Sequence, residues 1–411
     1  MVSIAVMGHG TVGSGVIEVI NKNHKIIDDR VKDEIYVKYI LDLRDFPELP
    51  YCDKFIKDFN VILNDPEIKI VVEVMGGLKP AYDYTKKCLL AGKSVVTSNK
   101  ELVAAKGAEL LKIAEDNNVN FMFEASVGGG IPIIRPLYQC LAANEVIDIT
   151  GILNGTTNFI LTKMIKEGMS FENALALAQQ LGYAERNPAA DVEGHDACRK
   201  ICILSALAYN RHVYPEQVHT EGIAKITAVD VAFAASCGCV VKLVGRTRAV
   251  ENGVECIVCP MLLKKDNPLS NVDGVFNAIK VNGDMTGDVM FYGKGAGKLA
   301  TASAVVADIM DCVKHINARK YLSWDEGYDG YVVDYLEYET SMYIRCRIKD
   351  RHTAKAAIRR EFGSVEFLNC FEAPENEIAF ITSKYKEKTL NDKLKKISDV
   401  ITPLNFIRVC D

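Results

Sequence analysis

The chain has 411 residues, of which 49% are hydrophobic and 25% are charged, and its formal net charge at pH 7 is −5. These are ordinary values for globular proteins, and they exclude collagen-like, coiled-coil and disordered chains. The length exceeds what one hydrophobic core usually supports, which predicts two or three domains. Because there is no excess of positive charge, we expect no nucleic-acid partner.

The cysteines and the first residues indicate the cellular compartment in which the protein is expected. The 13 cysteines are spread along the chain instead of forming a short, dense framework, and residues 1–7 lack the basic region of a signal peptide. We therefore expect reduced thiols in a cytoplasmic protein. No run of 18 apolar residues occurs, so we expect no membrane-spanning segment.

The first predicted element is a buried strand over residues 2–7, followed by a glycine-rich turn and a helix. Gly8, Gly10 and Gly13 give the turn the pattern Gly-x-Gly-x-x-Gly. In a dinucleotide site, the first glycine makes the tight turn, the second admits the diphosphate, and the third lets helix and strand pack closely. The diphosphate lies at the helix N-terminus, which predicts a dinucleotide coenzyme.

Strands and helices alternate through the next hundred residues. The predicted strands cover residues 35–41, 70–74, 94–97 and 120–123, and the predicted helices cover residues 80–91 and 102–117. This alternation predicts an α/β domain with a doubly wound, Rossmann-type parallel sheet that binds its ligand at the carboxyl ends of the strands. Gly76-Gly77 and Thr97-Ser98-Asn99-Lys100 follow two of these strands, so we expect them at that edge.

The residues after the second strand leave the choice between NAD and NADP open. A carboxylate there normally bonds the adenosine ribose and excludes a 2′-phosphate, whereas an arginine accepts the phosphate. Asp42, Arg44 and Asp45 all lie within four residues. We expect Arg44 to pair with the phosphate and Asp45 to orient its guanidinium, so that NADP is accepted at least as well as NAD.

The middle of the chain contains a polar cluster between two predicted helices at residues 171–181 and 194–209. Asp196 and Lys200 lie one helical turn apart, and an isolated pair of this kind is usually a surface ion pair. Here an acidic loop with glycines and a proline precedes the pair. That context equally favours a binding site for a small zwitterion or a lysine that acts as acid or base.

The last part of the chain has a different pattern. Alternating residues predict a strand over 337–348, and further elements follow in the order helix, strand, strand, helix. They cover residues 353–362, 365–371, 377–383 and 389–399. This is a βαββαβ pattern, which predicts a separate C-terminal unit.

Several segments of the chain resemble homoserine dehydrogenases. They are residues 8–13, 97–100, 124–132, 151–156, 182–200 and 293–297. Their order and approximate spacing also fit, from residue 2 to about residue 320. The resemblance implies an enzyme that interconverts L-aspartate 4-semialdehyde and L-homoserine with NAD or NADP. This reaction lies on the route to threonine, isoleucine and methionine.

The resemblance also implies roles for single residues. Lys200 matches the lysine that gives a proton to the aldehyde oxygen, and Lys100 matches a second active-site lysine near nicotinamide and substrate. Asp196 matches a residue that holds the surroundings of the reacting oxygen in place. Glu185 and Asp191 match carboxylates that bind the substrate, suited to its ammonium group.

Two further sets of residues follow from the resemblance and the glycine motif. The expected coenzyme contacts are Gly8, Gly10, Thr11, Val12, Gly13, Arg44, Gly76, Lys100 and Gly295, the last in a loop that closes over the coenzyme. Glu124, Val127, Gly129 and Ile131 match a loop of the family that holds a monovalent cation. The ion would be sodium or potassium, bound mainly through backbone carbonyls.

The resemblance divides the chain into three units. It implies a nucleotide-binding domain over residues 1–130, completed by about 293–320, and a substrate-binding and dimerisation domain of α+β type over 131–292, in a homodimer or higher homo-oligomer. Residues 335–411 are similar to the ACT domains that some of these enzymes carry as amino-acid sensors. However, residues 349–353 read Lys-Asp-Arg-His-Thr where ACT domains usually have Asp-x-Pro-Gly. We expect a dimerisation or degenerate regulatory module rather than a working threonine sensor.

Two other functions fit part of the sequence. Another NAD(P) dehydrogenase of small substrates would keep the first domain but lack the group of residues from Glu185 to Lys200. A catalytically inactive, amino-acid-responsive regulator would tolerate loss of the lysines, yet Lys100 and Lys200 are both present. The absorbance of reduced nicotinamide discriminates between them when the purified protein is given homoserine and NAD or NADP, with and without threonine.

Overall fold

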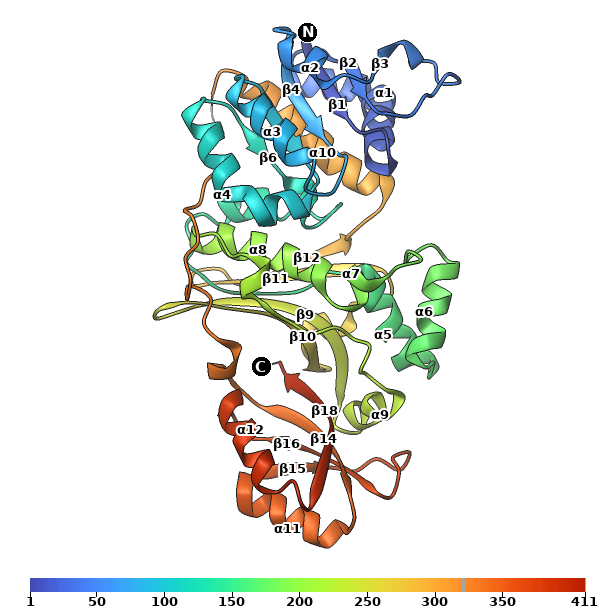
Figure 1. The fold of residues 1–411 in the computed structure, drawn as a ribbon, viewed down its shortest axis with the longest axis vertical. Coiled ribbons are helices and arrows are strands. Elements are labelled where there is room, and N and C mark those ends of the chain that lie inside the picture. The colour runs from blue at the N-terminus through green and yellow to red at the C-terminus, as the bar shows by residue number, and fades with distance from the viewer. Residues whose placement is uncertain (319–321, 411) are drawn as a thin grey trace.

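The computed structural model describes residues 1–318 and 322–410, and its two large sheets lie one above the other (Figure 1). The first sheet is parallel, with the strand order β3-β2-β1-β4-β5-β6. Its strands are β1 (Val2–Met7), β2 (Ile35–Leu41), β3 (Phe55–Ile56), β4 (Ile68–Glu73), β5 (Ser94–Thr97) and β6 (Phe121–Met122). The order reverses next to β1, as in a doubly wound sheet.

Helices cover both faces of this sheet. They are α1 (Thr11–Val31), α2 (Phe59–Asn64), α3 (Ala81–Leu90) and α4 (Lys100–Asp116). Successive residues of β1 belong to two separate cores: Ile4 and Val6 pack on the side of α1, whereas Ala5 and Met7 pack on the side of α3 and α4. The sequence therefore predicted this sheet correctly, except for the short elements α2 and β3.

A helix from late in the chain completes this unit. Helix α10 (Lys298–Lys314) lies beside α1 in Figure 1, and its Val305 and Ile309 share a buried core with Val16. The two helices approach closely, because a Cβ atom on Gly15 would lie 2.9 Å from the carbonyl oxygen of Lys298. Residues 319 and 320, which end the segment expected to complete the domain, lie outside the described residues, as does Asp411.

The second sheet is mixed and has the strand order β12-β11-β7-β9-β10-β18-β14-β16-β15, with β8 paired to β10. The strands that the middle of the chain contributes are β7 (Val146–Ile152), β8 (His219–Thr220), β9 (Cys239–Val250), β10 (Gly253–Lys264), β11 (Phe276–Gly283) and β12 (Gly287–Lys294). The helices of this region are α5 (Gly155–Glu167), α6 (Phe171–Gln180), α7 (Ala189–Val192), α8 (His195–Tyr209) and α9 (Ala228–Ser236).

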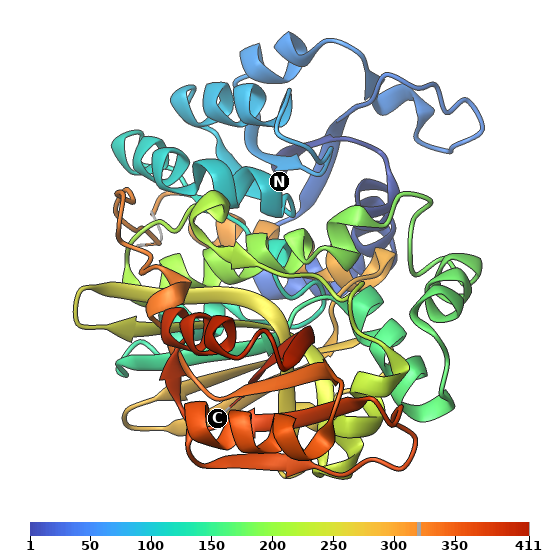
Figure 2. The same ribbon diagram turned by 60° about the horizontal axis from the view of Figure 1, so that its bottom comes forward.

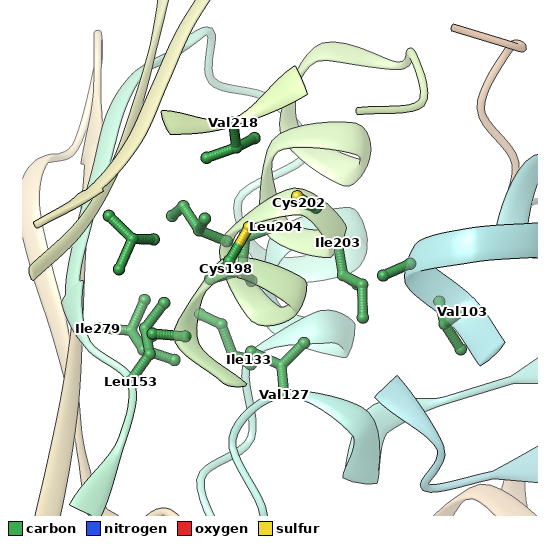
Figure 3. Close-up of a cluster of buried hydrophobic side chains, with 14 of the residues drawn as sticks. Val103, Val127, Ile133, Leu153, Cys198, Cys202, Ile203, Leu204, Val218 and Ile279 are labelled. Atoms are coloured by element: carbon green, nitrogen blue, oxygen red, sulfur yellow. The ribbon is translucent and has the colours of Figure 1, made fainter. Parts of the chain in front are cut away.

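Helix α8 is buried between the second sheet and the first unit. In Figure 3, Leu153, which directly follows β7, and Ile279 of β11 lie on one side of α8, while its Ile203 points toward Val103 of α4. All of these side chains belong to one continuous core. The packing of α8 therefore fixes the position of its polar residues relative to α4.

The C-terminal strands and helices have the predicted βαββαβ order, in front in Figure 2. They are β14 (Met342–Ile348), α11 (Arg351–Phe362), β15 (Val365–Leu368), β16 (Glu377–Thr382), α12 (Glu387–Lys396) and β18 (Ile401–Val409), with a small ribbon of β13 (Glu339–Thr340) and β17 (Tyr385–Lys386). Strand β18 pairs in parallel with β10, which joins this unit to the central sheet. That residues 335–411 are related to ACT domains stays a prediction. No helix in the described ranges is long and apolar enough to cross a membrane.

Candidate active site

The glycine-rich turn has the geometry that the motif predicts. Gly8 has a φ of +101°, in the region that favours glycine. A Cβ atom on Gly13 would lie 2.0 Å from the carbonyl oxygen of Gly8, so only glycine fits there. Gly10 is the N-cap of α1 and contributes no side-chain cap. Within the described residues, no side chain caps the backbone N–H groups of Thr11 and Val12, as in helix N-termini that bind a diphosphate.

Arg44 is held by Asp42, not by Asp45. Its guanidinium donates to both carboxylate oxygens of Asp42, from Nε at 3.0 Å and from Nη2 at 2.9 Å. The same carboxylate accepts the backbone N–H groups of His9 and Arg44, and the guanidinium holds the pKa of Asp42 well below its usual range. Asp45 instead pairs with Lys57 at 2.7 Å. The expectation that Asp45 orients the guanidinium was wrong.

Two lysines share the carboxylate of Asp196. Lys100, the first residue of α4, approaches one oxygen at 2.7 Å, and Lys200 donates to the other at 2.8 Å. Lys200 also donates to the backbone carbonyl of Leu153 at 2.7 Å. Asp196 and Lys200 are buried, whereas Lys100 is partly exposed. The structure thus brings together residues that are 100 positions apart in the sequence.

Asn154 extends this cluster to Asp191, and sequence reasoning did not single it out. Its side-chain N–H group donates to Asp191 at 2.7 Å and to Asp196 at 2.9 Å, while its Oδ1 accepts the backbone N–H of Thr157 as the N-cap of α5. The cap could have been predicted from an asparagine between a strand and a helix. The bridge could not, because it depends on tertiary packing.

The buried charges alter each other's protonation. Burial lowers the pKa of the Lys200 ammonium, the nearby charge of Lys100 acts in the same direction, and Asp196 opposes both. Burial also raises the pKa of Asp191. At Asp196 burial opposes ionisation, but the two lysines outweigh it and hold its pKa well below the usual range. The site therefore contains a fixed anion and a lysine that releases its proton more easily than usual.

Glu185 is placed differently from the other predicted residues. It lies exposed on the loop between α6 and α7, and its side chain forms no hydrogen bond or ion pair with any residue in the described ranges. Only its backbone carbonyl is engaged, by Gln179 at 3.1 Å. The structure therefore does not by itself join Glu185 to the cluster around Asp196.

The loop of residues 124–131 packs against the glycine loop that precedes α10. The Glu124 carboxylate accepts the backbone N–H groups of residues 133–135, at distances from 2.6 to 2.9 Å. A Cβ atom on Gly129 would lie 2.4 Å from the carbonyl oxygen of Gly295. Within the described residues, the backbone carbonyls of Val127, Gly129 and Ile131 accept no hydrogen bond.

A dinucleotide-type turn and a buried lysine–carboxylate cluster on adjacent units define an NAD(P)-dependent oxidoreductase. The model of the homoserine dehydrogenase NAD-binding domain matches residues 8–124, and that of homoserine dehydrogenase matches residues 132–310. The chain therefore belongs to the homoserine dehydrogenase family. It catalyses the NAD(P)-dependent interconversion of L-aspartate 4-semialdehyde and L-homoserine, in threonine, isoleucine and methionine biosynthesis.

Two of the relatives named here match nearly the whole chain, and a third matches three quarters of it. A homoserine dehydrogenase of Neisseria gonorrhoeae is 37% identical over 99% of this chain and 98% of its own length. The crystal structure of a homoserine dehydrogenase from Thiobacillus denitrificans has a TM-score of 0.92 and 36% identity, and covers 100% of this chain and 98% of that one. A hyperthermophilic archaeal homoserine dehydrogenase in complex with NADPH has a TM-score of 0.64 and 30% identity, over 75% of this chain and 97% of its own.

The two functions of Asn154 can be separated by substitution. Asn154→Ala should lower the free energy of unfolding by about 1 kcal/mol through loss of the cap, and should also lower turnover because Asp191 and Asp196 lose their shared donor. Asn154→Ser should restore most of the stability, since serine also caps helices, but not the turnover. Urea unfolding and steady-state rates check this. Recovery of turnover in the serine variant would show that Asn154 acts only as a cap.

Proposed function

We propose that Lys200 exchanges the proton with the reacting oxygen of the substrate. The observation that carries this proposal is the carboxylate of Asp196, which is shared by Lys200 and Lys100. The bound nicotinamide supplies or accepts the hydride. In the direction of homoserine formation, the carbonyl oxygen gains negative charge and needs a proton, which a lysine of lowered pKa supplies.

The hydrogen bonds of Lys200 support this role. An ammonium has three N–H donors, and two of them are directed to Asp196 and the Leu153 carbonyl. The third is available for a substrate oxygen. Lys100 is the second positive charge at this carboxylate, and we assign it to the nicotinamide side of the site, because it begins α4 directly after strand β5 of the nucleotide-binding sheet. Asp196 is the positioning residue for both lysines.

Lys200→Ala should lower turnover by about 10²–10⁴-fold, the usual contribution of general acid–base catalysis, while the Kd of the coenzyme stays the same. Steady-state kinetics and calorimetric titration measure the two effects. Lys200→Arg is the matched control, because it keeps the positive charge but holds its proton at neutral pH, and it should be about as inactive. Near-normal turnover in either variant would remove Lys200 from the chemistry.

We assign the ammonium group of homoserine to Asp191 and Glu185. Asp191 is connected to Asp196 through the side chain of Asn154, which donates a hydrogen bond to each carboxylate. The side chain of Glu185 has no partner among the described residues and is exposed on the loop before α7, so its carboxylate remains available to a ligand. A positively charged group held by these carboxylates would leave the hydroxyl end of the substrate for Lys200.

Asp191→Asn and Glu185→Gln should raise the KM for homoserine strongly and leave the KM for NADP nearly unchanged. Loss of one partner of a buried charge pair costs about 2–5 kcal/mol in binding, whereas neutralising an exposed loop residue costs a few tenths of a kcal/mol. The control substrate is 4-hydroxybutyrate, which lacks the amine. It should be a poor substrate of the unaltered enzyme and should be affected much less by the substitutions. Equal losses for both substrates would mean that the carboxylates only hold the loop.

For the coenzyme we propose that NADP is accepted at least as well as NAD. All four acceptor positions of the Asp42 carboxylate are used by His9 and Arg44, which leaves none for a ribose hydroxyl. Arg44 is exposed and keeps further N–H donors for a 2′-phosphate. The remaining contacts that we assign come from the turn at Gly8, Gly10, Thr11, Val12 and Gly13, and from Gly76, Lys100 and Gly295.

Arg44→Ala should weaken binding of NADP more than binding of NAD, because only NADP loses a charge-assisted pair. Calorimetric titration with each coenzyme gives the two Kd values. Lys57→Ala, which removes a nearby cation paired only with Asp45 among the described residues, is the control and should change the NADP to NAD ratio less. A similar loss for both coenzymes in Arg44→Ala would rule out this assignment.

A monovalent cation, sodium or potassium, fits the loop that contains Glu124, Val127, Gly129 and Ile131. Three of its carbonyls accept no hydrogen bond within the described residues, and hard cations prefer such oxygen ligands. The Glu124 carboxylate is occupied by three backbone N–H groups, so Glu124 would contribute its carbonyl. The ion would stiffen the junction with the loop at Gly295 and would not take part in proton transfer.

We also assign functions to the three units of the chain. We assign nucleotide binding to residues 1–130 with α10, and substrate binding and dimerisation to residues 131–292. The edge strand β12 exposes Met290 and Tyr292, which suits a homodimer or higher homo-oligomer. In the unit from residue 335 onward, the Asp350 carboxylate caps α11, but residues 349–353 lack the Pro-Gly of ACT domains, which favours a dimerisation or degenerate regulatory role over a threonine sensor.

A cytoplasmic location is part of the same proposal. The buried thiols of Cys88, Cys202 and Cys259 are not joined in disulfides. Such thiols are typical of proteins in a reducing compartment.

A further inference from the structure

Asn277 is a buried polar residue to which neither the sequence nor the reaction assigns a role. It lies near the start of β11, opposite Gly293 of β12, and it is 2% exposed. Its side-chain oxygen has no hydrogen-bond partner in the described parts of the chain. An unpaired buried amide is costly, so proteins rarely keep one without a function for it.

The side chain of Asn277 lies against two segments of the proposed active site, at Gly295 and Gly155. A Cβ atom on Gly295, in the loop before α10, would lie 2.0 Å from its Nδ2, and a Cβ atom on Gly155, the first residue of α5, would lie 3.4 Å from its Oδ1. Glycine at position 295 therefore lets the backbone lie directly against the amide. Asn277 thus lies between the loop assigned to the coenzyme and the helix that Asn154 caps.

We propose that Asn277 binds the coenzyme, through hydrogen bonds between its side-chain amide and the carboxamide group of the nicotinamide ring. Both groups carry one carbonyl acceptor and N–H donors, so they can pair in two directions at once. The substrate offers an ammonium and a carboxylate instead, and a neutral buried amide would leave either charge without a counter-charge. Pairing at the carboxamide would restrict the rotation of the ring, and with it the ring face that meets the substrate.

A coenzyme analogue tests this pairing directly. The 3-acetylpyridine analogue of NADP has a methyl group in place of the carboxamide nitrogen and cannot donate to Oδ1. Calorimetric titration without substrate should show that the unaltered enzyme binds the analogue about tenfold more weakly than NADP, the upper end for one neutral hydrogen bond. In Asn277→Leu, NADP should bind about as weakly as the analogue, so that the discrimination disappears.

Thermal unfolding of the coenzyme-free protein separates binding from a structural role. Leucine has a similar size and removes the unpaired oxygen, so the Tm of Asn277→Leu should be equal to that of the unaltered protein or higher. A lower Tm would mean that the amide supports the fold. If the leucine variant does not fold, Asn277→Ala replaces it in the titrations. Asn282→Ala, on the same strand, is the control, because Asn282 bonds Asp288 at 2.6 Å, and it should keep the discrimination.

Three results would overturn the proposal. The first is equal affinity of the unaltered enzyme for NADP and the analogue. The second is a variant at position 277 that still discriminates between them. The third is a higher KM for homoserine with an unchanged coenzyme Kd, which would assign the amide to the substrate. Because the titrations contain no substrate, they do not depend on the roles of Lys200 and Asp191.

Discussion

The active site depends on one carboxylate that binds two ammonium groups from two separate units. Lys100 begins a helix of the nucleotide-binding sheet, whereas Asp196 and Lys200 lie on a helix of the second sheet. Two ammonium groups that contact the same carboxylate would repel each other without the negative charge between them. Asp196 therefore ties the two units together, and it also opposes the lowering of the Lys200 pKa by burial. Removal of this carboxylate would disturb geometry and charge together.

The junction between the units is also defined by glycines. Gly129 has no room for a side chain because the backbone of Gly295 lies against it, and Gly295 has none because it lies against the side chain of Asn277. The backbone of residues 133–135, which follows this loop, is held by Glu124, whose carboxylate accepts their three N–H groups. Asp308 of α10 in turn accepts the backbone N–H of Glu124 at 2.8 Å. The loop that we assign to the cation and the loop that we assign to the coenzyme thus form one packed structure.

Much of this architecture could be predicted from the sequence, because buried parallel strands and amphipathic helices leave clear local patterns. The strands at residues 2–7, 35–41 and 94–97 have the predicted bounds. An element as short as β3 cannot be predicted in this way, because two residues are too few to show a hydrophobic pattern. Arg44 was assigned to the wrong aspartate because adjacency in sequence says little about which side chains meet, whereas residues two apart, such as Asp42 and Arg44, can share a face.

The polar site was predicted less completely, for a related reason. The acidic loop and the Asp196–Lys200 spacing are local features, so they were visible. The meeting of Lys100 with Asp196, the bridge made by Asn154 and the side-chain oxygen of Asn277, which lacks a partner in the described residues, all depend on contacts between distant segments. The roles of the lysines came from the family resemblance, which supplies information that spacing alone does not contain.

The late position of α10 has a consequence for synthesis of the chain. The face of the first sheet that holds Ile4 and Val6 is covered in part by Val305 and Ile309. A ribosome has to make about three quarters of the protein before this apolar face is closed. The first unit must therefore remain incomplete while the second is made, and chaperones would find exposed hydrophobic surface on the nascent chain during that interval. Termination before α10 would yield an aggregation-prone fragment, not a free nucleotide-binding domain.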